Sequence, residues 1–354
     1  MECAILGPMN PVSLLAVETA VPPHRVTRAE AQAFARSVYA GALPGYGALD
    51  RVFETSTVAQ RWLARPLDWY GAGHGWSDRA AAFTETATAL LREVGARAIS
   101  RAGLEARDVD QVLCVSTTGF AAPSLDARLI APLGLRPDVG RTPVFGWGCA
   151  GGVIGVARAA DLARSRPGAV VLLLVVELCS LAFRHDPEPV NVVGSALFGD
   201  GAAAGVLRLD DGRAPKVGDS VEHTWPDSLD VMGWRVDDGG FGLELRRDLP
   251  AFLADRLRPV VQRFLDTRGL GPGDLDGWVV HPGGPKVLDA VAASLDLSPD
   301  ALDDSRAVLA AYGNASAAGV LMVLRRILDR GGRGRHLMLA LGPGFTAAAN
   351  LLEL

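Results

Sequence analysis

One pattern occurs twice in this chain, and the repeat constrains the fold more than any other feature. In the first copy a glycine-rich loop, GWGCAGG, places Cys149 at the start of a helix of small and aliphatic residues. In the second copy, YGNASAAGVLMVL places Asn314 at the corresponding point. Thirty-three residues before each of them an apolar strand ends, at Ser116 in one copy and at His281 in the other. The chain is therefore predicted to use one α/β unit twice.

Each copy continues with a break rich in Gly, Arg or Pro and then a further strand, Ala169 to Val176 in the first and Leu337 to Leu341 in the second. Continuous apolar strands that alternate with helices are typical of a mostly parallel sheet buried on both faces. An α/β fold is predicted. A pseudo-twofold axis between the copies would bring the thiol of Cys149 close to the imidazole of His281 and the amide of Asn314.

The polar segment DDGRAPKVG, Asp210 to Gly218, is the best candidate for a boundary between the two copies. We predict an N-terminal half over residues 1–212 that carries Cys149, and a C-terminal half over residues 213–354 that carries His281 and Asn314. A second polar, glycine-rich segment, Val236 to Gly242, is predicted to form a hairpin near a site.

Charge and composition exclude several classes of protein. The formal net charge is −5, so the basic footprint of a general nucleic-acid-binding protein is absent. The four cysteines show no CxxC pair and no zinc spacing, which favours a reducing cytoplasm and predicts no metal site. No export signal is visible. The longest apolar run, Ala169 to Val176, is too short to span a bilayer.

Cys149 has the sequence context of a nucleophile. A thiol at a helix N-terminus faces unpaired backbone N–H groups and the positive end of the helix dipole, and both lower the pKa of a thiol. A neighbouring imidazole would hold the thiolate as an ion pair. The alternative is a small apolar residue packed in a core, the usual role of a cytosolic cysteine.

His281 follows a short apolar strand and precedes Pro-Gly-Gly-Pro. A histidine at a strand end points into the crevice where α/β sheets bind ligands, although a lone histidine can equally be a core residue. Asn314 at a helix start can serve as an N-cap. If both side chains also donate hydrogen bonds to one substrate oxygen, they form an oxyanion hole for a thioester carbonyl or for an enolate.

These residues, in this order on a duplicated α/β unit, resemble the thiolase superfamily, and within it the type III polyketide synthases of the chalcone synthase-like group. The resemblance extends over roughly residues 110 to 346 and is weaker in the first hundred residues. The motifs that carry it are GCAGG around Cys149, GSALFGDGAAAGVL at 194–207, HPGGPKVLDAV at 281–291, YGNASAAGVLMVL at 312–324 and LGPGFT at 341–346.

The resemblance implies a duplicated five-layer αβαβα fold, a homodimer, and acyl-CoA and malonyl-CoA as substrates with no further cofactor. It implies that Cys149 accepts the acyl group and that His281 and Asn314 drive decarboxylation of the malonyl unit. Phe198 falls on the family's aromatic gatekeeper between the active site and the coenzyme A tunnel; taken by itself, it is equally a core phenylalanine.

Departures from the family pattern suggest an open cavity. The family's second gatekeeper aromatic corresponds to Leu243, and small residues stand where plant members often carry threonines or a methionine. This pattern is similar to bacterial members that extend fatty acyl-CoA starters to alkylpyrones or alkylresorcinols. The residues expected to line the cavity are Thr117, Ala121, Ala122, Cys179, Ala182, Phe198 and Leu243.

Coenzyme A contacts are less well defined by the sequence. Of the family's N-terminal basic cluster only Arg51 is retained, and Arg61 is the arginine that we expect to compensate.

Two other enzyme classes use the same set of side chains. A β-ketoacyl synthase III employs Cys, His and Asn with an acyl carrier protein, but its members carry His-Gln-Ala-Asn where this chain has His281-Pro-Gly-Gly. Papain-like hydrolases do not duplicate an α/β unit, and they place the cysteine near the mature N-terminus. Both comparisons favour the polyketide synthase.

A non-catalytic scaffold with a thiolase-like fold is the alternative from another functional class. Retention of all three polar residues argues against it. A stoichiometric acyl adduct on Cys149 after incubation with acyl-CoA would distinguish the enzyme from the scaffold.

Overall fold

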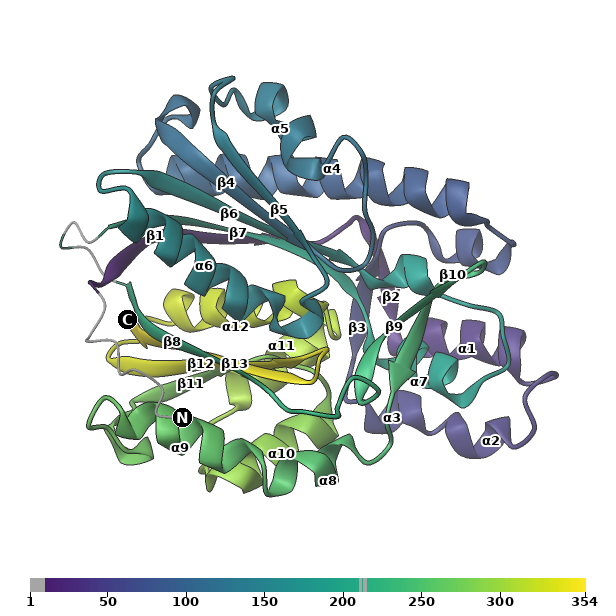
Figure 1. Cartoon of the computed structure of the whole chain (residues 1–354). Helices are drawn as coiled ribbons and strands as arrows, with labels where there is room; N and C mark the ends of the chain where they lie inside the picture. Colours follow the sequence, from purple (N-terminus) through teal and green to yellow (C-terminus); the bar gives the residue numbers. More distant parts are fainter. Residues whose placement is uncertain (1–9, 210–211, 213–214) are drawn as a thin grey trace.

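The computed structural model describes residues 10–209, 212 and 215–354. Within these residues nine strands form one sheet in the order β11-β12-β13-β8-β1-β7-β6-β4-β5. Only two residue pairs, Val12 with Val217 and Ser13 with Lys216, join β1 (Val12–Ala20) to β8 (Lys216–Thr224). At this junction the sheet folds over into two stacked layers, as Figure 1 shows.

The two layers have the same pairing pattern, which confirms the predicted repeat. In each layer two parallel strands are followed by an antiparallel one, which in turn pairs antiparallel with β1 or with β8. The upper layer has an additional edge strand, β5, parallel to β4. The strands concerned are β4 (Val109–Ser116), β5 (Gly140–Phe145), β6 (Val170–Leu178) and β7 (Asp200–Leu209), and β11 (Gly277–Val280), β12 (Arg335–Gly342) and β13 (Thr346–Glu353).

Helices cover both outer faces and fill the space between the two sheets, so the chain has the five layers expected (Figure 1). Two helices of the middle layer begin at corresponding points of the two copies, just after Cys149 and just after Asn314. The outer helices are α4 (Trp76–Arg101) and α5 (Leu125–Leu133) above and α8 (Leu249–Ala254), α9 (Leu257–Asp266) and α10 (Pro285–Leu295) below; those between are α6 (Gly151–Ser165), α11 (Asp303–Tyr312) and α12 (Ser316–Asp329).

Small residues let α6 and α12 approach closely in the middle layer. A Cβ atom at Gly152 would overlap the carbonyl oxygen of Ala317, and one at Gly151 would lie 3.1 Å from the Cβ of Ala317. Side chains at these two positions would therefore push the helices apart. The glycines after Cys149 thus bring the N-terminal ends of both helices, and the residues that precede them, to one place.

A smaller part of the chain lies beside the two sheets (Figure 1). It contains two small antiparallel sheets of two strands each, β2–β3 and β9–β10, which pair only within themselves among the described residues. Only β9 and β10 form a hairpin, and its turn lies within the segment predicted to form one, Val236 to Gly242. The elements of this part are β2 (His24–Thr27), β3 (Gln60–Leu63), β9 (Met232–Asp237), β10 (Gly240–Leu245), α1 (Arg28–Tyr39), α2 (Tyr46–Leu49), α3 (Val52–Thr55) and α7 (Pro189–Leu197).

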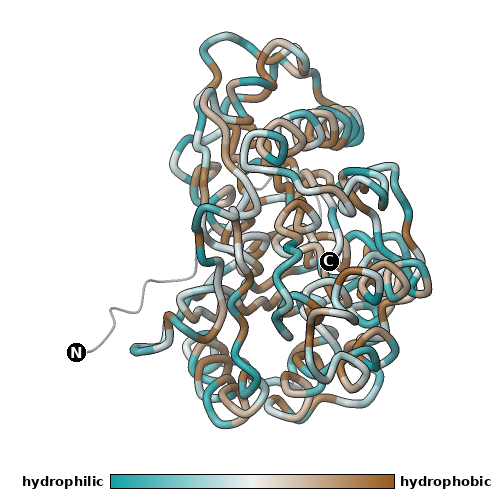
Figure 2. The backbone as a smooth tube through the Cα atoms, turned by 90° about the vertical axis from the view of Figure 1, so that its right-hand side faces the viewer, coloured by the Kyte–Doolittle hydropathy of each residue, from teal (hydrophilic) through white to brown (hydrophobic). Residues whose placement is uncertain are grey.

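Hydrophobic segments gather in the interior of the two layers, and hydrophilic ones follow much of the outline (Figure 2). All nine residues of β6 are buried, which agrees with the apolar run seen in the sequence. None of the helices in the described ranges is long and apolar enough to cross a membrane. Most of the polar connection before β8 lies outside the described residues, so the proposed division at residue 212 stays a prediction.

Candidate active site

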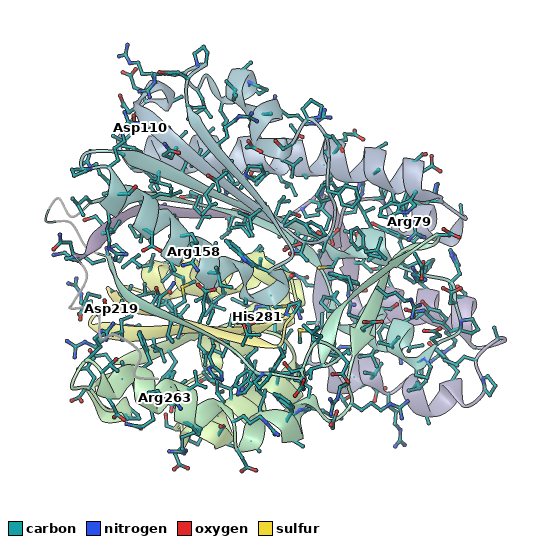
Figure 3. The ribbon with its side chains drawn as sticks, viewed as in Figure 1. Arg79, Asp110, Arg158, Asp219, Arg263 and His281 are labelled. Carbon is teal, nitrogen blue, oxygen red and sulfur yellow. The ribbon has the colours of Figure 1, made fainter. Side chains whose placement is uncertain are left out.

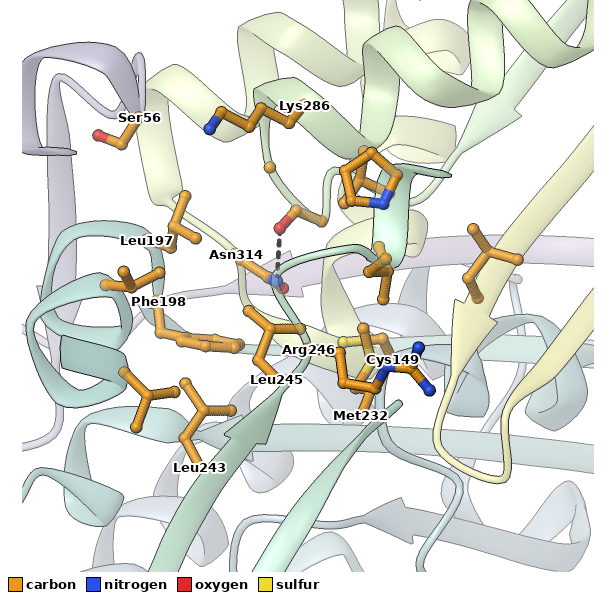
Figure 4. Close-up of a pocket in the computed structure, with 18 of the residues that line it drawn as sticks. Ser56, Cys149, Leu197, Phe198, Met232, Leu243, Leu245, Arg246, Lys286 and Asn314 are labelled. Atoms are coloured by element: carbon orange, nitrogen blue, oxygen red, sulfur yellow. Dashed lines mark hydrogen bonds between the residues drawn. The ribbon is translucent and has the colours of Figure 1, made fainter. Parts of the chain in front are cut away.

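Cys149, His281 and Asn314 line one cavity of about 750 Å³. The two copies of the repeat therefore contribute to the same site, as predicted. The walls are mainly aliphatic and aromatic, with side chains from α7, the β9–β10 hairpin and the start of α10. Figure 3 shows His281 near the middle of the molecule, and Figure 4 shows the pocket itself.

Cys149 lies in a short 3-10 turn, Gly148–Ala150, immediately before α6. Gly148 has a φ of +50°, and a Cβ there would overlap the ring of Pro343, so only glycine fits this turn. The hydroxyl oxygen of Thr117 accepts a hydrogen bond from the Gly148 amide at 2.8 Å and holds the turn from behind. The Cys149 sulfur lies 3.8 Å from the Ser316 hydroxyl oxygen.

The expectation of a lowered thiol pKa at Cys149 is wrong. The side chain is buried, with 7% of its surface exposed. Desolvation of the charged form raises the pKa of the Cys149 thiol to about 12, and the hydroxyl of Ser316 offsets only part of this. Cys149 is therefore a neutral thiol until a base removes its proton.

We predict that alkylation of Cys149 by iodoacetamide accelerates roughly tenfold per pH unit from pH 7 to pH 9, because below its pKa the thiolate fraction rises tenfold per unit. No plateau is expected in this range. Peptide-level mass spectrometry measures the adduct on Cys149 separately from the other cysteines. A rate that stays constant from pH 7 to pH 9 would instead indicate a thiolate preformed at the helix terminus.

His281 follows β11, and its backbone N–H donates to the Leu339 carbonyl at 2.9 Å. Its imidazole is 4% exposed, and neither ring nitrogen has a hydrogen-bond partner among the described residues. Burial lowers the pKa of His281 to about 3, so the ring is neutral at physiological pH. An orphaned, buried imidazole that lines a cavity is available to a substrate.

Hydrogen bonds fix both the side chain and the backbone of Asn314. Its side-chain oxygen accepts from the Ser316 N–H at 2.9 Å, and its amide nitrogen donates to the Gly283 carbonyl at 3.1 Å (dashed in Figure 4). Its backbone pairs with the Leu197 carbonyl and the Gly199 N–H, on either side of Phe198. The N-cap of α12 is Ala315, so the interpretation of Asn314 as the N-cap is wrong. Asn314 precedes the cap, accepts from the first N–H of the helix, and keeps its amide nitrogen at the cavity.

Phe198, Trp234 and Leu243 separate the main cavity from an inner pocket of about 80 Å³, since these three side chains line both. Cys179 and Ala182, both expected near the cavity, line the inner pocket. The ring centroids of Phe198 and Trp234 are 6.2 Å apart. Phe198 thus lies at a partition.

Basic side chains line the solvent-exposed part of the cavity, which we call its mouth, where Arg51, Arg247 and Lys286 are exposed. The cations that line it are Arg51, Arg246, Arg247 and Lys286, against a single acidic residue, Glu188. Arg246 pairs with Asp230 and Asp248, but no carboxylate of the described residues pairs with the other three cations. The cavity therefore combines an apolar interior with a mouth suited to a phosphate-bearing ligand.

Two family models together match nearly the whole chain: "Chalcone and stilbene synthases, N-terminal domain" over residues 8–211 and "Chalcone and stilbene synthases, C-terminal domain" over residues 217–353. The chain belongs to the chalcone and stilbene synthase family. It is a type III polyketide synthase, and so an enzyme of the acyltransferase type.

Relatives cover almost the full length of this synthase. A 1,3,6,8-tetrahydroxynaphthalene synthase of Streptomyces peucetius is 41% identical, over 96% of this chain and 93% of its own. The solved structure of the Streptomyces coelicolor A3(2) enzyme of the same name, a bacterial type III polyketide synthase, is 32% identical with a TM-score of 0.92, covering 96% of this chain and 99% of its own. PKS-I of Ectocarpus siliculosus is 29% identical with a TM-score of 0.90, covering 97% and 98%.

Arg61 does not lie at the mouth of this synthase. Its side chain is 2% exposed, and its guanidinium donates to the backbone carbonyls of Ser195 and Ala196 near the end of α7. A structural role therefore replaces the coenzyme A contact expected of it. Arg51 does line the main cavity, as expected.

Three residues expected around the cavity lie elsewhere in a single chain of the synthase. Thr117 is buried behind the Cys149 turn, where its N–H donates to the Glu177 carboxylate at 3.1 Å. Ala121 and Ala122 follow the exposed ring of Phe120 at the surface and line neither the main cavity nor the inner pocket. In a single chain, the loop after β4 therefore keeps Ala121 and Ala122 out of the site.

Sequence reasoning missed several residues that line the main cavity: Met232, Trp234, Arg246, Arg247, Lys286 and Ser316. Most of them lie outside the repeat, so the pairing of copies gave no signal for them. For Lys286 the sequence does offer a signal, because the chain has only two lysines. Ser316 is distinguished only in the structure, where its φ is +46°. Glu177 was also missed; it is fully buried, and desolvation raises the pKa of its carboxyl to about 8.

Proposed function

We propose that the synthase performs iterative decarboxylative Claisen condensation on a thioester of Cys149. The observation that carries the proposal is the meeting of a thiol, an unpartnered neutral imidazole and a fixed amide in one apolar cavity. Acyl-CoA transfers its acyl group to the Cys149 sulfur, and coenzyme A leaves as the thiol. His281 accepts the Cys149 proton as general base, and the attraction between the imidazolium and the thiolate so formed offsets the cost of desolvating the two charges.

Malonyl-CoA then loses carbon dioxide beside His281 and Asn314, and its electron pair passes to the thioester oxygen as an enolate. An N–H of the neutral imidazole and the amide N–H of Asn314 stabilise this oxygen. The enolate carbon attacks the Cys149 thioester, a carbon–carbon bond forms, and the Cys149 sulfur is released for the next round. A dry apolar cavity strengthens both hydrogen bonds.

The starter was expected to be a medium- or long-chain fatty acyl group, giving an alkylpyrone or alkylresorcinol. The small side chains of Cys179 and Ala182 support an apolar chain that enters the inner pocket. However, that pocket has only about 80 Å³, roughly the share of liquid volume of two or three water molecules. A long chain therefore requires Trp234 or Leu243 to move.

A second candidate uses malonyl units alone. Two observations favour it: Trp234 restricts the inner pocket, and relatives named above are called tetrahydroxynaphthalene synthases. That product is a ten-carbon aromatic without an alkyl chain, so a deep acyl pocket is not needed. Of the two starters, the malonyl group fits better, because it does not need the small inner pocket behind Trp234 and Leu243.

Incubation with carbon-13-labelled malonyl-CoA, alone and with a ladder of acyl-CoA starters, tests the function and the starter together. Fully labelled aromatic product without added starter supports the malonyl candidate. Products whose mass grows with the unlabelled acyl chain support the fatty acyl candidate. Absence of any condensation product with either would contradict the proposed function.

The basic mouth is proposed to bind the phosphates of coenzyme A. Replacing Lys286 with alanine should raise the KM for CoA thioesters by about tenfold, the effect of losing a charge-assisted hydrogen bond. Thioesters of N-acetylcysteamine, which lack the phosphates, should show no change. Arg101→Ala, on α4 far from the mouth, is the matched control. An equal rise in KM for both kinds of thioester would contradict the assignment.

A homodimer is proposed from the surface near β5. This strand ends the sheet, and the rings of Phe120 and Phe145 beside it are 61% and 52% exposed. Edge strands and large exposed rings are commonly covered by a partner chain. Sedimentation velocity of the native protein tests this proposal, and a monomer at micromolar concentration would contradict it.

A further inference from the structure

The β9–β10 hairpin forms the wall between the two pockets. Because side chains alternate along a strand and Trp234 pairs with Leu243, one face of the hairpin carries two of the three partition residues. Met232 and Leu245, on the same face, line the main cavity. Among the described residues neither strand pairs with the large sheet, so other contacts must fix the position of this wall.

Arg184 supplies such contacts at the tip of the hairpin. Its Nε donates to the Phe241 carbonyl at 3.1 Å, and its Nη2 donates to the Gly240 carbonyl at 2.8 Å and to the Asp237 carboxylate. Nη1 lies 3.5 Å from the Asp186 carboxylate. The side chain is only 8% exposed. A buried guanidinium with this many partners is held in one position, and so are the groups it binds.

The hairpin leaves room for this guanidinium on the face opposite the partition. A Cβ atom at Gly242 would lie 3.1 Å from the Arg184 Cζ, and one at Gly239 would lie 3.3 Å from it. Side chains at these two positions would push the guanidinium away from the hairpin carbonyls. The absence of side chains at Gly239 and Gly242 therefore leaves the space that the Arg184 guanidinium occupies.

The same residue is anchored to the floor of the inner pocket. Arg184 is the second residue after the 3-10 turn Cys179–Ala182, most of whose residues line that pocket, and Arg184 lines it too. Its carbonyl accepts a hydrogen bond from the Tyr39 hydroxyl at 2.5 Å. Arg184 therefore links the 3-10 turn that lines the inner pocket to the β9–β10 hairpin that separates this pocket from the main cavity.

We infer that Arg184 is a positioning residue that sets the width of the passage between the two pockets, and thereby the length of chain that the synthase holds before release. The inference rests on the proposed function, because only an enzyme that extends a chain has a product length to control. Arg184 touches neither Cys149 nor His281 nor Asn314, so the steps of decarboxylation and bond formation do not depend on it directly.

The contacts of Arg184 with Asp237, Gly240 and Phe241 are called the clamp below. Two substitutions weaken it, one on each side of the ion pair. Arg184→Met removes every donor and keeps a long apolar side chain, whereas Asp237→Asn removes one charge at a position whose side chain is 36% exposed. Arg235→Gln is the matched control, because Arg235 binds the same Asp237 carboxylate from the half-exposed side and does not contact the rest of the clamp. If Arg184→Met does not fold, Asp237→Asn still tests the inference.

Hydrogen exchange of the amides in residues 232–245, product ratios and the rate of malonyl-CoA decarboxylation are then measured on the full-length native protein. We expect exchange in the hairpin to accelerate by about tenfold or more in both clamp variants, as loss of a hydrogen bond to a charged group implies. The ratio of the two main product lengths should change at least about threefold, with decarboxylation within about twofold of wild type, since the site donors are intact.

Unchanged exchange in both clamp variants would overturn the clamp itself. Accelerated exchange with unaltered product ratios would overturn its role in specificity, and so would an equal change in Arg235→Gln. If the wild-type protein forms no polyketide, the proposed function fails and the product readout with it, whereas the exchange readout still decides whether Arg184 holds the hairpin.

Discussion

Replacing Cys149 with alanine is expected to abolish polyketide formation from acyl-CoA and malonyl-CoA. Loss of the attacking group in acyl-transfer enzymes lowers kcat by about 10⁴-fold or more. Decarboxylation of malonyl-CoA should stay within about tenfold of wild type, because the donors at His281 and Asn314 remain. Product formation and release of carbon dioxide are measured in parallel on the same samples.

Intact-protein mass spectrometry provides the control. Wild type should gain one acyl group from acyl-CoA, and the Cys149→Ala variant none. Cys179→Ala, at the second buried cysteine near the cavity, should still be acylated once. Unchanged turnover in Cys149→Ala, or an acyl adduct that persists without this thiol, would contradict the mechanism.

The second large effect is expected at Asn314. Removing one donor from an oxyanion site lowers kcat by about 10²–10³-fold, so Asn314→Ala should slow malonyl-CoA decarboxylation by this factor. Transfer of the starter to Cys149 should be much less affected, because the thiol and His281 are retained. Single-turnover acylation followed by mass, against steady-state release of carbon dioxide, separates the two steps.

A second variant tests whether the Asn314 side chain acts by donating to substrate or only by holding the first N–H of α12. Asn314→Asp keeps an oxygen that can accept from the Ser316 N–H, but it has no N–H to donate. Both variants should therefore lose decarboxylation. Activity retained in Asn314→Asp would show that holding the Ser316 N–H at the start of α12, rather than donating to substrate, is the role of this side chain.

Most of the fold was predictable from the sequence because its signals are local or repeated. The apolar run in β6 and the glycines at the start of α6 indicate a buried strand and a closely packed helix without knowledge of any partner. The repeat register then aligned Ser116 with His281 and Cys149 with Asn314, which is why the three site residues could be grouped before the fold was known.

The rest of the site depends on contacts between segments far apart in the sequence. Nothing near Arg61 indicates that its guanidinium binds carbonyls of α7, more than a hundred residues later. Trp234 lines the partition only because a hairpin outside the repeat folds over the cavity. The charge state of Cys149 depends on how deeply the finished fold buries it, and the helix terminus alone predicted the opposite shift.

The position of β1 bears on how the protein is made. This strand is the first element among the described residues, yet its neighbours in the sheet are β7 and β8, which begin at Asp200 and Lys216. At translation rates of 5–20 residues per second, the ribosome takes roughly 10–40 s to synthesise the residues between them. Throughout that time the nascent apolar strand Val12–Ala20 has no native partner. A chain released before Asp200 would expose it permanently, so the unfinished protein is the form most in need of a chaperone.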